Sequence, residues 1–295
     1  MQFEAVRRVV FEGWAALARK GASMSMRIGS SGISYAAIRY LHQAESDVAR
    51  SSARLASGRR INSAADDPAG LAIADRFRAE VASLSRAQLN TSDGVGLAQV
   101  AQSGLSEIAS MLSDARALAV QSSSGSLGGQ TRAQLDTQFQ AILDDIDAIA
   151  SNASFGSFKP LADGALQVAL AVGTQAGDTI TVSGVDAGTS AIGVGSLAIA
   201  TSGGAAAGLA TLDTAISKVS ALAARFGIAE NRLESRSRLL GAQIEAHSAA
   251  ESRIRDTDFA FETAQLARSQ ILQETAVAVL GQANANMRIV LRLLD

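Results

Sequence analysis

The sequence contains no cysteine and only two prolines, Pro68 and Pro160, in 295 residues. Without cysteine the chain can form no disulfide, no thiolate metal site and no thiol nucleophile. The scarcity of proline leaves long stretches in which nothing forces a helix to break. Aromatic residues make up 4% of the chain while apolar residues reach 47%. This composition favours narrow contacts between helices over a thick core of large side chains.

The net charge is small, and the sequence has no long apolar run. The formal net charge is −2, so the sequence predicts no strong attraction to nucleic acid or to an anionic membrane surface. No run reaches the roughly 18 apolar residues of a transmembrane helix, so no membrane insertion is expected.

Few residues suggest chemistry. Asp66 and Asp67 could form a metal or acid–base pair, but helix capping accounts for Asp67, and His42 and His247 are single residues on expected helices. The sequence has neither a His-Glu-x-x-His nor a Gly-x-Ser-x-Gly motif. The run at 203–208 lacks the Gly-Lys-Ser/Thr ending of a phosphate loop, and we interpret it as a linker. We predict no catalytic residue, no cofactor site and no metal site, and we do not expect an enzyme.

The stretch 55–78 predicts a helix end, a polar connector and a helix start. Gly58 can adopt the left-handed conformation that ends a helix. Asp67 is typical of an N-cap whose carboxylate accepts backbone N–H groups. Pro68 fits the first helical position, where its missing N–H would be unpaired anyway.

Both ends of the chain predict helices with one narrow apolar stripe. The N-terminal helix is expected at 26–58 and the C-terminal helix at 259–295. Such a stripe suits a single partner helix rather than a globular core. The stripe residues, which recur in steps of three and four or multiples of them, are Ile33, Ala37, Leu41, Ala44, Val48, Ser51 and Leu55, then Leu266, Leu272, Ala276, Val279, Ala283, Val290 and Leu294.

The segment between these helices predicts a rod domain at 59–258. Long helices are expected at 68–121, 131–150 and 211–254, the second opened by a capping box of Thr131 and Gln134. Alternation at 155–200 predicts a β-hairpin region, with a possible short strand at 192–199. A helix over 68–121 would be roughly 80 Å long, too long for a compact globule. The fold class is therefore mainly α, a long-helix coiled-coil rod with a small β-hairpin region and paired N- and C-terminal helices.

Residues 1–25 differ from the rest and leave two interpretations open. Val6, Val10, Trp14 and Leu17 share one helical face, and basic residues outnumber acidic ones by two. This pattern is compatible with a helix on a membrane surface. It is also compatible with an extension upstream of a functional start at Met24 or Met26. A secretory signal fits poorly because Glu12 interrupts the apolar segment.

Three strings near the N-terminus, followed by a matching C-terminus, resemble bacterial flagellins. The strings are Arg54-Leu-Ala-Ser-Gly58, Arg60-Ile-Asn-Ser-Ala64 and Asp66-Asp-Pro-Ala-Gly70, and the C-terminal match includes Ser252-Arg-Ile254 and Gln270-Ile-Leu-Gln273. The resemblance covers about 26–175 and 210–295. It implies an inner coiled-coil domain built from both termini, a rod domain of long helices, and a short form without the large outer domains of many flagellins.

The resemblance also implies a function. Flagellins are structural subunits that polymerise into the secreted, extracellular flagellar filament for motility. The partners implied are other copies of the chain, an export chaperone, and cap and junction proteins. Two alternatives stay open: a hook–filament junction protein of the same family, and a surface-displayed homologue that binds polysaccharide.

The terminal stripes lead to a hypothesis about the subunit interface. One helix with about seven small or medium apolar residues buries too little surface to offset the entropy of ordering it. We therefore expect 27–55 and 259–295 to be largely disordered in the monomer and to fold together on assembly. The expected subunit-interface residues are Ile33, Leu41, Val48, Leu55, Leu272, Val279, Val290 and Leu294.

Overall fold

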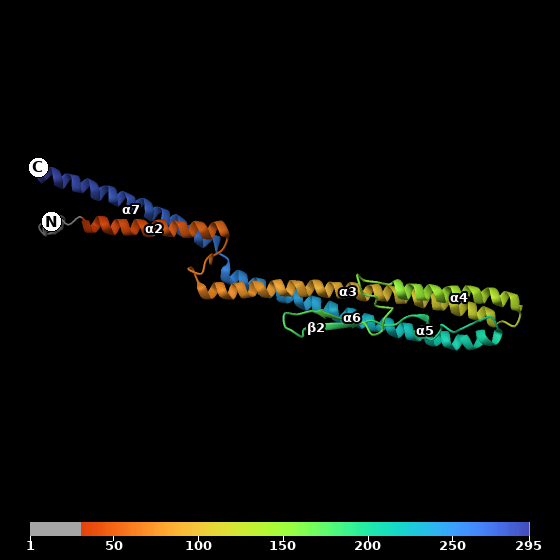
Figure 1. Ribbon diagram of the computed structural model, residues 1–295. Helices are drawn as coiled ribbons and strands as arrows, with labels where there is room; N and C mark the ends of the chain where they lie inside the picture. Colours follow the sequence, from red (N-terminus) through yellow and green to blue (C-terminus); the bar gives the residue numbers. More distant parts are fainter. Residues whose placement is uncertain (1–30, 295) are drawn as a thin grey trace, which may run out of the picture. The chain divides into compact units, whose positions relative to one another are not determined.

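The computed structural model describes the backbone of residues 31–294 (Figure 1), and side-chain surroundings for residue 32 and residues 34–289. The proposed extension at 1–25 lies outside the described residues. The elements are α2 (Ser31–Ser57), α3 (Pro68–Ser123), α4 (Gly129–Asn152), β1 (Gln167–Ala171), β2 (Thr179–Ser183), α5 (Thr189–Ile192), α6 (Ser202–Arg255) and α7 (Phe259–Leu294). The predicted fold class is confirmed: the chain is mainly helical, has one small hairpin, and pairs its first described helix with its last.

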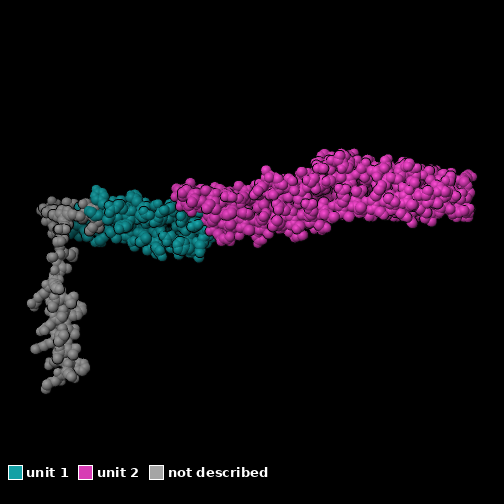
Figure 2. Space-filling view, turned by 90° about the horizontal axis from the view of Figure 1, so that it is seen from below, with its two compact units in different colours: residues 1–62, 256–295 teal, residues 63–255 magenta. Residues whose placement is uncertain are grey.

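The described chain forms two compact units (Figure 2). One contains α2 and α7, and the other spans residues 63–255. The larger unit is built on the long pair α3 and α6, which lie side by side. With 56 residues, α3 is about 84 Å long. Helix α6 buries a large apolar side chain every seven residues along this pair, as in a coiled coil, namely Leu212, Val219, Phe226, Leu233 and Leu240.

The connector before α3 has the predicted chemistry. Gly58 ends α2 with a φ of 69°, in the left-handed region. Asp67 is the N-cap of α3, and its Oδ1 accepts a hydrogen bond from the Gly70 N–H at 2.9 Å. Pro68 occupies the first helical position. These local interactions fix where α2 ends and α3 begins.

Helix α4 packs on the second half of α3, but it does not begin as predicted. Its N-cap is Gly128, which makes no side-chain cap, so the predicted Thr131–Gln134 capping box is wrong. The loop is held by Arg132 instead. Its Nε donates to the Ser122 carbonyl at 3.0 Å and its Nη2 to the Ser124 carbonyl at 2.8 Å. One arginine thus satisfies carbonyls at the end of α3. Helix α4 begins at Gly129, two residues before the predicted start at residue 131.

The predicted linker at 203–208 is also wrong, because α6 begins at Ser202 and includes these residues. Thr201 caps this start by accepting from the Gly204 N–H at 3.1 Å. Ala205 and Gly208 are buried, and a Cβ on Gly204 would lie only 2.8 Å from the Ala198 carbonyl oxygen. The small residues therefore serve close packing rather than flexibility.

The possible strand at 192–199 is absent from the structure, which has α5 followed by an irregular loop there. Carboxylates on α4 instead hold this segment at the start of α5 and at Ile199. Asp147 accepts from the Thr189 N–H and hydroxyl, both at 2.7 Å, and Asp136 accepts from the Ile199 N–H at 2.6 Å. Val194 and Ile199 are fully buried. The alternation in the sequence reflects burial, not strand geometry.

The hairpin β1–β2 is antiparallel, with Val168 opposite Val182 and Leu170 opposite Ile180. Its tip is fixed to both long helices. On α3, the Asn90 Nδ2 donates to the Ala171 carbonyl at 3.0 Å. On α6, the Arg236 Nε donates to the Val172 carbonyl at 2.7 Å.

Leu170 packs where α3 carries Gly94, and this contact gives a prediction. A Cβ on Gly94 would clash with Leu170 Cδ1 and would lie 3.1 Å from Leu233 Cδ1. We expect Gly94→Ala to destabilise the larger unit by about 1–3 kcal/mol, measured by urea unfolding followed by circular dichroism. The control is Gly227→Ala on α6, whose Cβ would meet only the Gln102 Nε2, at 3.7 Å.

That control should stabilise the unit by about 0.5–1 kcal/mol, because helical glycine costs more backbone entropy than alanine. Equal effects of the two substitutions would contradict the role assigned to Gly94.

Candidate assembly interface

Helices α2 and α7 form an antiparallel pair (Figure 1). At one end, Arg59 and Asp256 form an antiparallel β-bridge, and the Thr257 N–H donates to the Gly58 carbonyl at 3.0 Å. Asp258 begins α7 by accepting from the Ala260 and Phe261 N–H groups, at 2.9 and 3.1 Å. The two helices are therefore joined by backbone bonds where α2 ends and α7 starts.

The buried positions of this pair follow a strict heptad spacing. Of the side chains described, α2 buries only Ala37, Ala44 and Ser51, and α7 buries only Glu262, Ser269, Ala276 and Ala283. All but Glu262 are small, so the backbones can approach closely. Small side chains also remove little apolar area from water, so the contact contributes little stability for its length.

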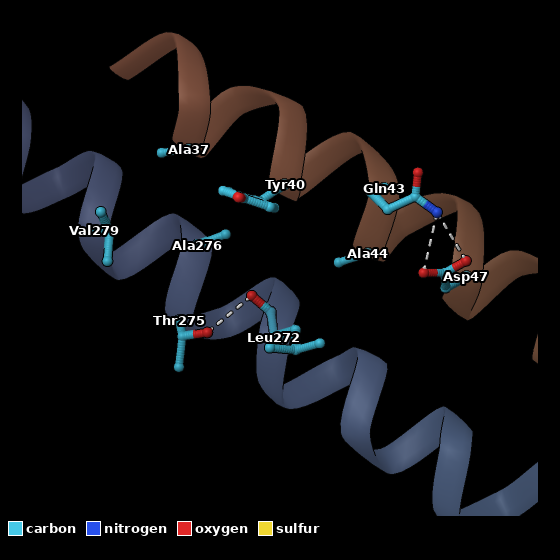
Figure 3. A pocket seen from close by; sticks show the side chains of 9 residues that line it. All are labelled: Ala37, Tyr40, Gln43, Ala44, Asp47, Leu272, Thr275, Ala276 and Val279. Carbon is cyan, nitrogen blue, oxygen red and sulfur yellow. Dashed lines mark hydrogen bonds between the residues drawn. The ribbon is translucent and has the colours of Figure 1, made fainter. Parts of the chain in front are cut away.

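A groove of about 280 Å³ runs along the pair (Figure 3). Its floor and walls are mainly apolar, and its polar groups bond within their own helices. The Gln43 Nε2 donates to both oxygens of Asp47, at 3.2 and 3.3 Å, and the Thr275 hydroxyl donates to the Leu272 carbonyl at 2.9 Å. The groove is lined by Ala37, Tyr40, Gln43, Ala44, Asp47, Leu272, Thr275, Ala276 and Val279.

Large apolar side chains of both helices remain exposed. On α2, Tyr35 is 66% exposed and Tyr40 is 72% exposed. On α7, Phe261 is 67% exposed and Ile271 is 60% exposed. Exposed apolar side chains that lie together, as Tyr40, Leu272 and Val279 do in the groove, are typical of a site of protein association.

The structure places the predicted interface residues in two groups. Leu272 and Val279 are 54% and 48% exposed and line the groove. Leu41, Val48 and Leu55 are half-buried on α2. The side chains of Ile33, Val290 and Leu294 lie outside the described residues. Sequence reasoning missed Tyr40 and the buried Glu262, although the spacing 262, 269, 276, 283 was a readable signal.

Residues that could suggest chemistry have structural partners. The His247 ring packs against Phe77, with centroids 5.4 Å apart, and its Nδ1 lies 3.2 Å from Glu80. Arg116 donates to Asp213 at 2.6 Å, and this bond together with the carboxylate charge raises the pKa of Arg116 above its ordinary value. Among the described residues, no three histidine or acidic side chains cluster as metal ligands. None of the described helices has a segment long and apolar enough to span a bilayer.

Comparison with known proteins supplies the family. Residues 28–164 match the bacterial flagellin N-terminal helical region, and residues 209–294 match the bacterial flagellin C-terminal helical region. The chain belongs to the bacterial flagellin family. Residues 165–208, which hold the hairpin and α5, alone separate the two matched regions. This flagellin is therefore a short form without a large middle region.

Two curated relatives agree with the assignment. The flagellin is 37% identical over 243 residues to a flagellin of Halalkalibacterium halodurans, covering 82% of this chain and 89% of the relative. It is 32% identical to a flagellar filament 30.7 kDa core protein of Treponema maltophilum, covering 82% and 90%.

One solved structure shares the fold. It is a putative flagellar hook-associated protein from Vibrio parahaemolyticus, 13% identical, with a TM-score of 0.56 over 65% of this chain and 100% of that one. At this identity the likeness concerns the fold alone.

Proposed function

We propose that this flagellin is a structural subunit that polymerises into the bacterial flagellar filament and serves motility. The observation that carries the proposal is the apolar surface left exposed on the paired terminal helices. Membership of the flagellin family supports it. A pair whose buried residues are nearly all small, and whose large apolar residues face outward, is incomplete until another molecule covers it.

Identical subunits provide that cover. Head-to-tail contacts between copies that do not close into a ring produce an open helical filament. The subunit contacts are assigned to the terminal helices, 26–58 and 259–295, and the helices between them form the rod domain, 59–258. The contact residues are Ile33, Leu41, Val48, Leu55, Leu272, Val279, Val290 and Leu294.

The remaining parts of the proposal follow from the family. The subunit is secreted through the flagellum-specific export channel and functions in the extracellular filament. Its partners are other copies of itself, an export chaperone, and the cap and junction proteins. It acts as a structural protein rather than as an enzyme, and it binds neither nucleic acid nor membrane.

Elongation from seeds tests this function. Filaments are sheared into short seeds, purified monomer is added, and lengths are measured by electron microscopy. The expected result is continuous growth into long filaments, both by the full chain and by a chain shortened to residues 26–295. Growth that stops after a few subunits would indicate a junction protein, and no growth under any salt condition would contradict the proposal.

A further inference from the structure

The buried stripe of the α2–α7 pair contains one large charged side chain, Glu262. Its side chain is 4% exposed, and the nearest cation is Arg54 of α2, with 3.7 Å between Arg54 Nη1 and Glu262 Oε2. The other carboxylate oxygen, Oε1, is buried and has no hydrogen-bond partner. A buried carboxylate with one unsatisfied oxygen is poorly arranged for stability, because its desolvation is only partly offset by a cation that is itself 30% exposed.

The first turn of a helix favours acidic side chains, which would explain an exposed glutamate there. That preference does not explain why Glu262 occupies the buried heptad position or faces a cation on another helix. The presence of Glu262 at this buried position therefore needs another explanation.

The other buried residues of the α2–α7 pair suggest that explanation. Ala37, Ala44 and Ser51 repeat every seven residues on α2, and Ser269, Ala276 and Ala283 repeat every seven on α7. A slip of one heptad therefore places small residues against small residues again. Such a slip would move α2 along α7 by about 10 Å. The small residues alone do not distinguish the two alignments.

We infer that the Arg54–Glu262 pair sets the register of α2 against α7, at the expense of stability. A single buried polar or charged group that selects one alignment is the best-attested role of such groups in paired helices. In the slipped alignment Glu262 would lose Arg54 and be buried as an unpaired charge. A slip would also break the backbone bridge between Arg59 and Asp256 and the Thr257–Gly58 bond at the same end, so these bonds favour the same register as the ion pair.

The register matters because residues of both helices build the groove. Tyr40 and Ala44 come from α2, and Leu272 and Val279 from α7 (Figure 3). A one-heptad slip would separate these residues and divide the surface that a second copy contacts. This consequence rests on the proposed function, whereas the register itself does not.

The register can be measured directly because the chain has no native cysteine. Ser52 of α2 and Gln270 of α7 are exposed, so Ser52→Cys and Gln270→Cys can carry spin labels. The labelled full chain is grown into filaments with an excess of unlabelled chain, and pulsed electron paramagnetic resonance gives the intramolecular distance. The otherwise unchanged chain should give one narrow distance distribution.

Arg54→Met with Glu262→Leu should give a second population with the axial offset changed by about 10 Å, and elongation at least about tenfold slower. One narrow distribution with normal elongation would overturn the inference. If this variant does not enter filaments, a chain in which the two charges are exchanged provides the test. Arg54→Glu with Glu262→Arg should recover one distance and elongation relative to Arg54→Glu alone, and no recovery would overturn the inference.

The matched control is Glu45→Gln, which removes the exposed His42–Glu45 pair, 3.5 Å apart on α2. It should keep one distance and elongate within about twofold of the unchanged chain. Failure of the unchanged chain to elongate would instead contradict the proposed function, so the two failures are distinguishable.

Discussion

Replacing Leu272 by aspartate should raise the critical concentration for filament assembly at least about 100-fold. Leu272 is 54% exposed in the single chain and lines the groove, so the substitution costs the monomer little. In a filament the same position is proposed to be covered by a neighbouring subunit. Burying an unpaired carboxylate there costs several kcal/mol, and about 2.7 kcal/mol already corresponds to a 100-fold change in affinity.

Sedimentation of assembled filaments over a range of monomer concentrations gives the critical concentration. Leu272→Met keeps an apolar side chain of similar size and should change it less than about threefold. Urea unfolding of the larger unit should be the same for both variants. Assembly of Leu272→Asp at the normal critical concentration would show that the groove faces solvent in the filament.

Local chemistry explains why much of the fold could be predicted from the sequence. Asp67 and Pro68 determine a helix start with two adjacent residues, and the structure has that cap. The heptads of α6 predicted one long helix because nothing interrupts them between Leu212 and Leu240. Patterns of this kind depend only on residues that are close in sequence, so they can be recognised without knowledge of the tertiary contacts.

The errors occur where distant residues decide the conformation. Helix α5 and the loop after it are held by Asp147 and Asp136 of α4, more than 40 residues away in sequence. The Gly/Ala run at 203–208 is helical, and its Ala205 is buried in the same core as side chains of α3 and α4. Neither interaction leaves a local pattern, so alternation and glycine content were misread as a strand and a linker.

The candidate interface was predicted in part for a related reason. The apolar stripe predicted pairing of the terminal helices, but we selected its large residues, whereas the single chain buries Ala44, Ser51 and Ala276. Apolar residues spaced by three and four define a stripe on a helix. The spacing does not show which of these residues are buried between α2 and α7 and which are left for contacts with another subunit. The large residues, including Val48 and Val279, remain the prediction for contacts between subunits.

The amide hydrogens of α2 and α7 should exchange rapidly in the soluble monomer and slowly in the filament. Ordering a residue costs about 1–2 kcal/mol of backbone entropy, whereas each buried methylene contributes about 0.8 kcal/mol. The α2–α7 pair buries mainly alanine and serine. The larger unit buries Phe139, Phe226 and many leucines, so its helices should be stable without assembly.

Hydrogen exchange followed by mass spectrometry gives the comparison within one molecule. In the monomer, segments containing Val48 and Val279 should show less than about tenfold protection, while the segment containing Leu105 exceeds about 1,000-fold. Polymerisation should raise protection at Val48 and Val279 by at least about 1,000-fold, equivalent to roughly 4 kcal/mol. Strong protection at both residues in the monomer would show that the helix pair is stable alone, and the coupling of its folding to assembly would be wrong.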